Sequence, residues 1–449
     1  MQHRIVQRED GSLSYGPASS LILTLPPEIT ALIFVHCLPD DEFIEPDPSV
    51  TPLVLLRICK QWRQIAVATP TLWSSLFIDF EWFHYREAVD VLFCDWISRS
   101  GSVPLAIKLH DGYCVPQKPL DLSQFNRFLL YPAHSGKLFP VDGKFPMLRK
   151  FIVECQSEAI YDGYPARVLA QASLLREVHF LVASWPELVL PWQSIREYTA
   201  ERISILQSID VLREGINLTY CHLSLDSVPT ITSLPPITNL QDLTLLERAD
   251  EHSLLIMDLL RGLTLPNLKH LALKFTDPEN RLAADITEFI SFARRSSLQL
   301  EALTLCLLPS SDADLLRCLE CLRSLVTLRL QLPASMDAFI GRLIPDDGFL
   351  PQLDSLHLVN FSPSWQHTPR DYTSPDSETM LEMLSARRLG PRLPLSTVHF
   401  NHGGSKAIAA FTARLKSDTR YKRCEGLGME LVFGKFSREL RYESWWVDW

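Results

Sequence analysis

The chain has 449 residues, of which 46% are hydrophobic and 21% charged, so it can bury a large core along most of its length. Its formal net charge of -10 excludes the general basic surface of a phosphate-binding protein, and we expect no nucleic-acid partner. The sequence contains no run of roughly 18 apolar residues and no signal-peptide core at its start, so we expect no membrane partner and a cytoplasmic or nuclear location.

Two short helices are predicted near the start of the chain, after a segment (residues 1–20) that we expect to be unstructured. The first is "LPPEITALIFVHCL", residues 25–38, where the two prolines suit a first turn and the glutamate suits the positive end of the helix dipole. The second begins in "LLRICKQWRQIAVATPTLW", residues 55–73, where Leu56, Cys59 and Trp62 recur at the spacing of one helix face. Such a small unit buries too little apolar area to be stable alone.

These residues resemble the F-box, and especially its fungal versions. "LPPEI" at 25–29, "LLRICKQWRQIA" at 55–66 and "PTLW" at 70–73 follow the order of that motif, and only the acidic connection over residues 39–52 is longer than its compact form. The resemblance implies an F-box over residues 21–80 that docks on the Skp-type adaptor, and through it on the cullin, of a ubiquitin ligase. The adaptor-binding residues that it implies are Leu25, Pro26, Ile29, Ile33, Leu55, Leu56, Cys59 and Trp62.

An alternative interpretation is that the same apolar residues form an ordinary core beneath the next predicted helix. That helix covers residues 81–100 and places Trp82, Tyr85, Val89, Leu92 and Trp96 on one face. We describe it as a linker helix between the F-box-like segment and the rest of the chain.

The long remainder, residues 101–449, is predicted to be a repeat array. After the alternating segment "VPLAIKL", an apolar-x-x-apolar-x-apolar pattern begins at residues 148, 175, 195, 218, 240, 268, 300, 325, 353 and 395. Helical patterns lie between several of these motifs, and the spacing resembles that of leucine-rich repeats, although the Asn or Cys of the repeat consensus is absent. We therefore expect an α+β or α/β fold, in which the helical F-box precedes a curved solenoid of irregular strand–helix units with a C-terminal cap.

Alternate residues of each predicted strand should point away from the core. The middle outward position of successive strands is then occupied by Ile152, His179, Thr199, His222, Thr244, Ala272, Thr304, Arg329, His357 and His399. A solvated polar face explains this column, and so does a surface that binds a target protein. For the second case the candidate residues are His222, Arg329, His357 and His399. We expect the patch to become more cationic below about pH 6.5, and we expect neighbouring positive charge to favour the neutral form of His357 and His399 at neutral pH.

Two features near the C-terminus allow a structural or a binding role. Residues 404–423 contain six basic residues and one acidic residue, which is typical of a solvated helix face and also suits an acidic partner. The tail "RYESWWVDW" carries three tryptophans, which suit a cap on the last repeat or an anchor for a partner.

Motifs for catalysis and cofactor binding are missing from the sequence. There is no phosphate-binding loop, no nucleophile elbow and no metalloprotease helix, and the one zinc-like cysteine pair, Cys318 and Cys321, has no second half-site. We therefore expect no cofactor, no metal and no enzyme activity of its own. The sequence favours a substrate-recognition subunit of a Skp-cullin-F-box ubiquitin ligase, and the alternative is a leucine-rich-repeat scaffold outside ubiquitination.

Overall fold

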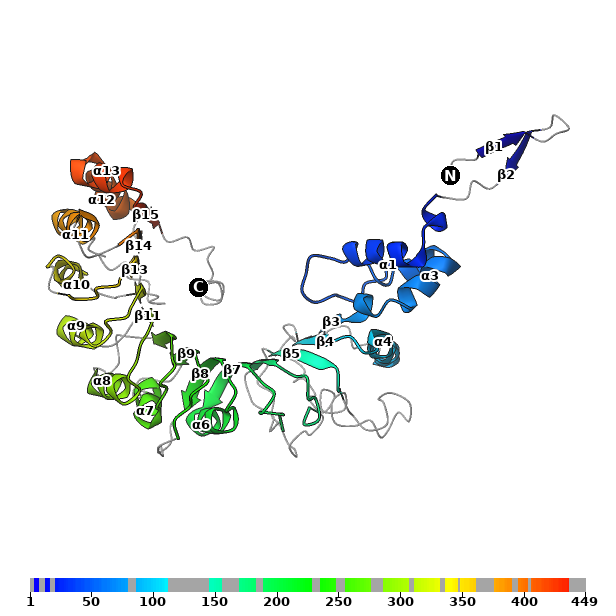
Figure 1. The fold of residues 1–449 in the computed structure, drawn as a ribbon, viewed down its shortest axis with the longest axis horizontal. Coiled ribbons are helices and arrows are strands. Elements are labelled where there is room, and N and C mark those ends of the chain that lie inside the picture. The colour runs from blue at the N-terminus through cyan, green and yellow to red at the C-terminus, as the bar shows by residue number, and fades with distance from the viewer. Residues whose placement is uncertain are drawn as a thin grey trace, which may run out of the picture. The chain divides into compact units, whose positions relative to one another are not determined.

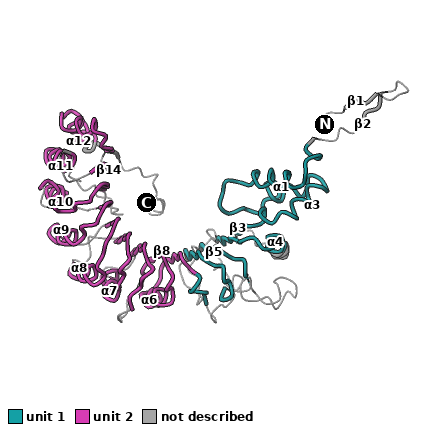
Figure 2. The backbone as a smooth tube through the Cα atoms, in the orientation of Figure 1, with its two compact units in different colours: residues 1–194 teal, residues 195–449 magenta. Residues whose placement is uncertain are grey.

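The computed structural model describes residues 4–7, 13–16, 21–79, 86–111, 145–155, 169–182, 189–227, 235–247, 255–275, 286–306, 311–331, 336–345, 348–360, 375–389, 395–402 and 405–435. The chain forms two compact units, residues 1–194 and 195–449 (Figure 2). Two short strands, β1 (Arg4–Gln7) and β2 (Leu13–Gly16), pair antiparallel in the N-terminal segment for which the sequence predicts no structure.

The first unit continues with short helices and a parallel sheet. Its helical elements are η1 (Leu21–Thr24), α1 (Pro27–His36), α2 (Leu55–Ile58), α3 (Lys60–Val67), η2 (Pro70–Trp73) and α4 (Arg86–Ser100). Its parallel strands are β3 (Ser75–Asp79), β4 (Leu105–Asp111), β5 (Leu148–Cys155) and β6 (Glu177–Val182), which pair in chain order.

The second predicted helix is two helices, not one. Cys59 lies between α2 and α3 in an extended conformation, with φ -156° and ψ 168°, so the helix cannot continue through it. Its sulfur accepts a hydrogen bond from the Trp62 backbone N–H at 3.4 Å and so acts as the N-cap of α3. The prediction of one continuous helix from the apolar spacing is therefore wrong, because periodicity does not reveal a capping side chain.

A corner of stacked tryptophans joins the helices of the first unit to its sheet. Trp73 and Trp96 are both fully buried, and their rings meet edge to face with centroids 4.9 Å apart. Both indole N–H groups are satisfied, since Trp73 donates to the Ala66 carbonyl at 2.9 Å and Trp96 to the Ser75 carbonyl at 3.0 Å. Helix α4 thus contacts η2 and the start of β3 through Trp96, and the predicted residues Trp82 and Tyr85 lie outside the described residues.

The acidic connection between α1 and α2 packs on this sheet. Ile44 is 3% exposed, and its carbonyl accepts the backbone N–H of Phe77 in β3 at 2.8 Å. Next to it, the Glu42 carboxylate lies 2.5 Å from the Lys150 ammonium of β5. The acidic connection is therefore ordered, and it joins the helices of the first unit to the strands of that unit.

The second unit repeats a strand followed by a helix (Figure 1). Its strands are β7 (Glu197–Ser204), β8 (Tyr220–Ser227), β9 (Asp242–Glu247), β10 (His270–Phe275), β11 (Ala302–Cys306), β12 (Thr327–Gln331), β13 (Ser355–Asn360), β14 (Thr397–His402) and β15 (Glu430–Lys435). Its helices are α6 (Ile205–Glu214), α7 (Leu255–Gly262), α8 (Ile286–Arg295), α9 (Asp312–Glu320), α10 (Asp337–Arg342), α11 (Ser377–Leu389), α12 (Ser405–Ser417) and α13 (Thr419–Gly426).

Each strand of the second unit pairs in parallel with the strand that follows it in the sequence. All ten apolar motifs of the sequence contain the start of a described strand, from β5 to β14, so the solenoid-like α/β arrangement is confirmed. The first, fourth and sixth motif positions are buried and mostly apolar, as with Leu268, Leu271 and Leu273. Within this unit the strands line the inner side of the array and the helices its outer side (Figure 2).

Side chains on the repeats bind the backbone of neighbouring units, although the consensus Asn or Cys is absent. Asn239 donates to the Ile216 carbonyl at 2.8 Å, and Asn267 donates to the Thr238 carbonyl at 2.7 Å, each from just before the first motif leucine. These contacts tie irregular units together, because each satisfies a carbonyl that the strand ladder leaves open.

None of the helices in the described part of the chain has the length and apolarity that crossing a membrane requires. The tryptophan-rich tail, residues 441–449, which we predicted to cap the array or to anchor a partner, lies outside the described residues.

Candidate functional sites

Exposed apolar side chains are concentrated on the short helices of the first unit. Among the described residues, thirteen large hydrophobic side chains are exposed, and six of them lie between residues 23 and 67. Five of these six lie on the short helices, and Val50 lies on the connection between α1 and α2. The six, which we call the apolar helical surface, are Leu23, Ile29, Leu32, Val50, Ile58 and Val67. Single exposed apolar residues need no explanation, but such a concentration is typical of a surface that another protein covers.

Helix α1 explains why this surface is apolar. Residues 31–35 are apolar without a break and therefore cover more than one full turn of the helix. A helix that is apolar on every side is normally covered on every side, whereas here only Thr30 and Phe34 are buried. Ile29 is 46% exposed and Leu32 57% exposed, so the described residues of the chain cover only one side of α1.

The eight sequence-predicted adaptor residues do not all lie at the surface. Pro26 and Ile29 are exposed, and the remainder apart from Leu55 are half-buried. Leu55 is 4% exposed, so it packs inside the helical segment and presents no contact surface. The Trp62 ring packs against the buried Phe34 ring with centroids 4.9 Å apart and the ring planes tilted by 59°, which holds α3 against α1.

We call one side of the second unit's sheet the inner face. It is the side that carries the predicted column of outward residues. The strand register confirms that column, because Thr199, His222, Thr244, Ala272, Thr304, Arg329, His357 and His399 are partners on successive strands. In the first unit Ile152 and His179 are partners in the same way. Sequence alternation alone therefore places every one of these side chains correctly relative to its neighbour.

Three of the four predicted target-binding residues lie together. Arg329, His357 and His399 occupy adjacent strands, and the two imidazole rings meet edge to face with centroids 4.6 Å apart. His222 is four strands away from Arg329, or about 19 Å at the usual strand spacing, so it does not belong to this cluster.

Polar neighbours lie beside both histidines, and burial acts on the titration of His357. The Ser355 hydroxyl lies 2.8 Å from His357 Nε2, and His399 Nε2 lies 3.5 Å from the Glu430 carboxylate. Burial, with the positive fields of His399 and Arg329, lowers the pKa of His357 from 6.5 to about 4. The expected effect of neighbouring positive charge is therefore confirmed in direction for His357, whereas its gain of charge comes well below pH 6.5 because burial adds to that effect.

A cavity of about 350 Å³ opens on the inner face between β8 and β14. Its wall contains five residues of the middle column, Thr244, Ala272, Thr304, Arg329 and His357, together with outward residues on either side of them. Toward the ends of the strands these are Lys274, Cys306, Gln331, Val359 and Asn401. At the other rim, His270 forms a short ion-pair contact with Asp242.

The deeper residues of this cavity are strongly affected by burial. Lys274 is 7% exposed, and burial followed by the field of Arg329 lowers its pKa, with only the thiol of Cys306 acting in the opposite sense. Burial also lowers the pKa of Arg329, and it raises the pKa of Cys306 to about 12, so that thiol is not a nucleophile at neutral pH.

Two polar residues of the cavity, Lys274 and Gln331, are not among the residues predicted from the sequence. Lys274 and Gln331 lie two positions beyond the middle column, so the same alternation points them to the same face. Strand alternation therefore also predicts that both side chains lie on this face, two residues beyond the middle column. On the helical segment, Leu32 and Ile58 are more exposed than several residues that the F-box resemblance implies.

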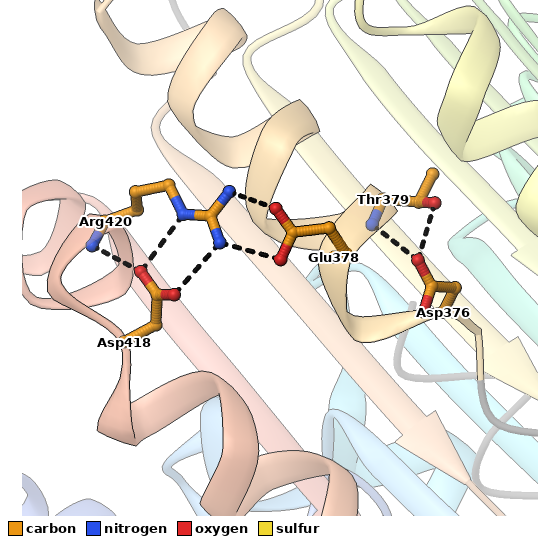
Figure 3. A network of polar contacts seen from close by, with 5 residues as sticks. All are labelled: Asp376, Glu378, Thr379, Asp418 and Arg420. Atoms are coloured by element: carbon orange, nitrogen blue, oxygen red, sulfur yellow. Dashed lines mark hydrogen bonds and ion pairs between the residues drawn. The ribbon is translucent and has the colours of Figure 1, made fainter.

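The basic segment near the C-terminus is partly an internal ion-pair network (Figure 3). Arg420 binds the Glu378 carboxylate through two nitrogens, at 2.6 and 2.8 Å, and also contacts Asp418. These hydrogen bonds raise the pKa of Arg420 and lower those of both carboxylates. The bidentate contact joins the start of α13 to the start of α11, so Arg420 holds the last two repeats together and is not a free partner-binding charge.

Metal-binding groups are not assembled in the part of the chain that the structure describes. No three His, Cys, Asp or Glu residues there are placed to hold one ion. Cys318 is buried and Cys321 is exposed, so the two thiols of the zinc-like pair occupy different environments.

No protein-family model matches this chain, and no curated protein sequence matches it.

Proposed function

We propose that this chain is the substrate-recognition subunit of a Skp-cullin-F-box type ubiquitin ligase. Residues 21–80 form the F-box that docks on the Skp-type adaptor, and the solenoid of the second unit holds the target protein. The observation that carries the proposal is the one-sided covering of α1, which leaves Ile29 and Leu32 exposed on a helix that is apolar on every side.

Adaptor docking supplies the cover that α1 lacks. Burying a leucine side chain of this kind stabilises a complex by about 1.5–3 kcal/mol before the cost of association, so each of these residues contributes favourably to docking. Pro26 supports this surface from the N-cap position, where its carbonyl accepts the Thr30 backbone N–H at 3.0 Å.

Target binding is assigned to the inner face of the second unit. Strand side chains there alternate between the leucine core and an outward surface of threonine, histidine and arginine residues, so specificity can vary without loss of the core. The subunit itself performs no chemistry in this scheme. It raises the effective concentration of target lysines near a ubiquitin-loaded conjugating enzyme by holding both partners on one assembly.

Co-purification of a Skp-type adaptor with the full chain tests the proposal. The double substitution Leu25→Ala and Pro26→Ala should weaken co-purification, because it removes apolar area at the entry to α1 and leaves the backbone hydrogen bond to Thr30 intact. Circular dichroism should remain unchanged. Full retention of the adaptor by this variant would show that the docking surface lies elsewhere, and failure of the unsubstituted chain to bind would favour the scaffold alternative.

A further inference from the structure

A strip of basic side chains lies on α2 and α3, in a segment without acidic residues. Residues 48–78 contain three basic residues and no Asp or Glu, in a chain whose formal net charge is -10. The three side chains, which we call the basic strip, are all exposed and belong to Arg57, Lys60 and Arg63. Arg63 donates through Nε to the carbonyl of Leu56 at 2.7 Å, and because this acceptor is neutral, the contact leaves the positive charge in place.

The exposed face of α3 combines this charge with apolar area. Residues that are three and seven positions apart lie on one side of a helix, so Lys60, Arg63 and Val67 share a face. Val67 is 41% exposed, and Ile58 of α2, next to Arg57, is 53% exposed. Exposed apolar side chains bordered by polar and charged ones are the usual composition of a protein–protein interface.

Lys60 is placed where a positive charge does not help the helix. It is the first residue of α3, directly after the N-cap Cys59, and the first turn contains no acidic residue. The positive end of the helix dipole lies at this terminus, so a lysine there is less favourable than a neutral or acidic residue. The charge of Lys60 is therefore not explained by the stability of α3, and it indicates a role outside the fold.

We propose that the basic strip attracts an acidic rim on the protein that covers the apolar helical surface. The inference rests on the proposed function, in which that protein is the Skp-type adaptor, and it specifies the chemistry of the adaptor's face as apolar side chains bordered by carboxylates. Complementary charges at the rim of an interface act mainly on the rate at which two proteins associate. The basic strip therefore raises the association rate, while the apolar side chains hold the complex together.

An anionic lipid surface would also attract the basic strip, but the rest of the chain disfavours it. Residues 39–52, which lead into α2, contain five acidic residues, and the chain as a whole is negative. An extended anionic surface would repel these charges as well as attract the strip, whereas a protein can place its carboxylates opposite the strip alone. The charge distribution therefore favours a protein, and lipid vesicles form a separate arm of the test.

Stopped-flow association of the full chain with a purified Skp-type adaptor tests the proposal. The variant is Lys60→Glu, and the matched control is Lys422→Glu, which reverses an exposed lysine on α13, another helix of eight residues. At about 0.1 M salt we expect Lys60→Glu to slow association by about threefold or more, Lys60→Gln to slow it less, and the control to leave it unchanged. At about 1 M salt the difference should vanish, because the Debye length falls from about 10 Å to about 3 Å.

The thermal midpoint separates this role from a structural one. A glutamate suits the positive end of the α3 dipole, so Lys60→Glu should keep or raise the midpoint of the chain while it slows association. Equal association rates for Lys60→Glu and the unsubstituted chain, or an equal slowing in Lys422→Glu, overturn this inference and leave adaptor docking intact. Absence of adaptor binding at either salt concentration contradicts the proposed function, and this inference with it. Binding to vesicles of about 30% phosphatidylserine in phosphatidylcholine that is lost in Lys60→Glu would assign the strip to a lipid surface instead.

Discussion

Replacing Arg387 with Met should destabilise the second unit strongly. Arg387 is fully buried on α11, and its guanidinium donates to three backbone carbonyls, those of Leu343, Phe349 and Leu350, at 2.7, 2.7 and 3.1 Å. Those carbonyls belong to the end of α10 and the turn before β13, so one side chain joins two consecutive repeats.

The magnitude follows from what each group loses. A buried acceptor left without a donor costs about 1–3 kcal/mol, so three carbonyls could cost several kcal/mol. Removing the guanidinium also removes the desolvation penalty of a buried charge, and Met fills much of the vacated volume. We expect a net loss of about 3 kcal/mol in the free energy of unfolding, and only partial recovery in Arg387→Lys, because an ammonium cannot reproduce the planar fork.

Urea denaturation followed by circular dichroism measures this loss. The matched control is Arg388→Met, one residue further along the same helix, where the guanidinium contacts a single carbonyl, that of Leu427. We expect the control to lose less than about 1 kcal/mol. Equal urea midpoints for the two variants would refute this role of Arg387 in joining the two repeats. So would a free energy of unfolding of Arg387→Met within about 0.5 kcal/mol of that of the unsubstituted chain.

Three further predictions concern pH, the connection and glycine. The pKa of His357 is about 4 in the folded chain and 6.5 when unperturbed, so the unfolded state takes up the proton first and stability falls as pH falls from 6.5 to 4. After allowance for solvent screening, we expect the free energy of unfolding to fall by about 1–2 kcal/mol over this pH range. Urea titrations at several pH values should show this fall in the unsubstituted chain and not in His357→Gln. Glu42→Ala should lower stability by about 0.5–1 kcal/mol, because it removes one carboxylate from Lys150; a thermal midpoint equal to that of the parent would argue against an ordered connection. Gly341→Ala in α10 should raise the free energy of unfolding by about 0.5–1 kcal/mol, because nothing lies within 4 Å of the added methyl group. Gly215→Ala should lower it, because the methyl group would overlap a leucine side chain and a backbone carbonyl. Calorimetric melting of the two variants measures both effects.

The sequence predicts the repeat array well because strand alternation is a local property. Leucines at the motif positions are buried, and the outward partners of Arg329 follow from counting by two along each strand. The same reasoning cannot supply the pKa of His357, since that depends on burial and on charges from neighbouring strands.

Prediction was weakest in the helical segment. The break at Cys59 depends on a sulfur that caps the following helix, and the burial of Leu55 depends on how the short helices pack. The ordered connection through Ile44 is a contact with β3, some thirty residues further along the chain, which no local pattern reports. The exposed side of α1 was visible only once the burial of each helix residue was known.

The most direct test of the central claim is the affinity of the full chain for a Skp-type adaptor, measured for two matched substitutions. Leu32→Asp alters the exposed side of α1, and Leu206→Asp alters a leucine of similar exposure on α6, at 57% and 54%. We expect Leu32→Asp to weaken adaptor binding by about tenfold or more, because a charge would be buried in the contact, and Leu206→Asp to leave it unchanged. No measurable binding by the unsubstituted chain, or equal affinities for the two variants, would contradict adaptor docking through α1.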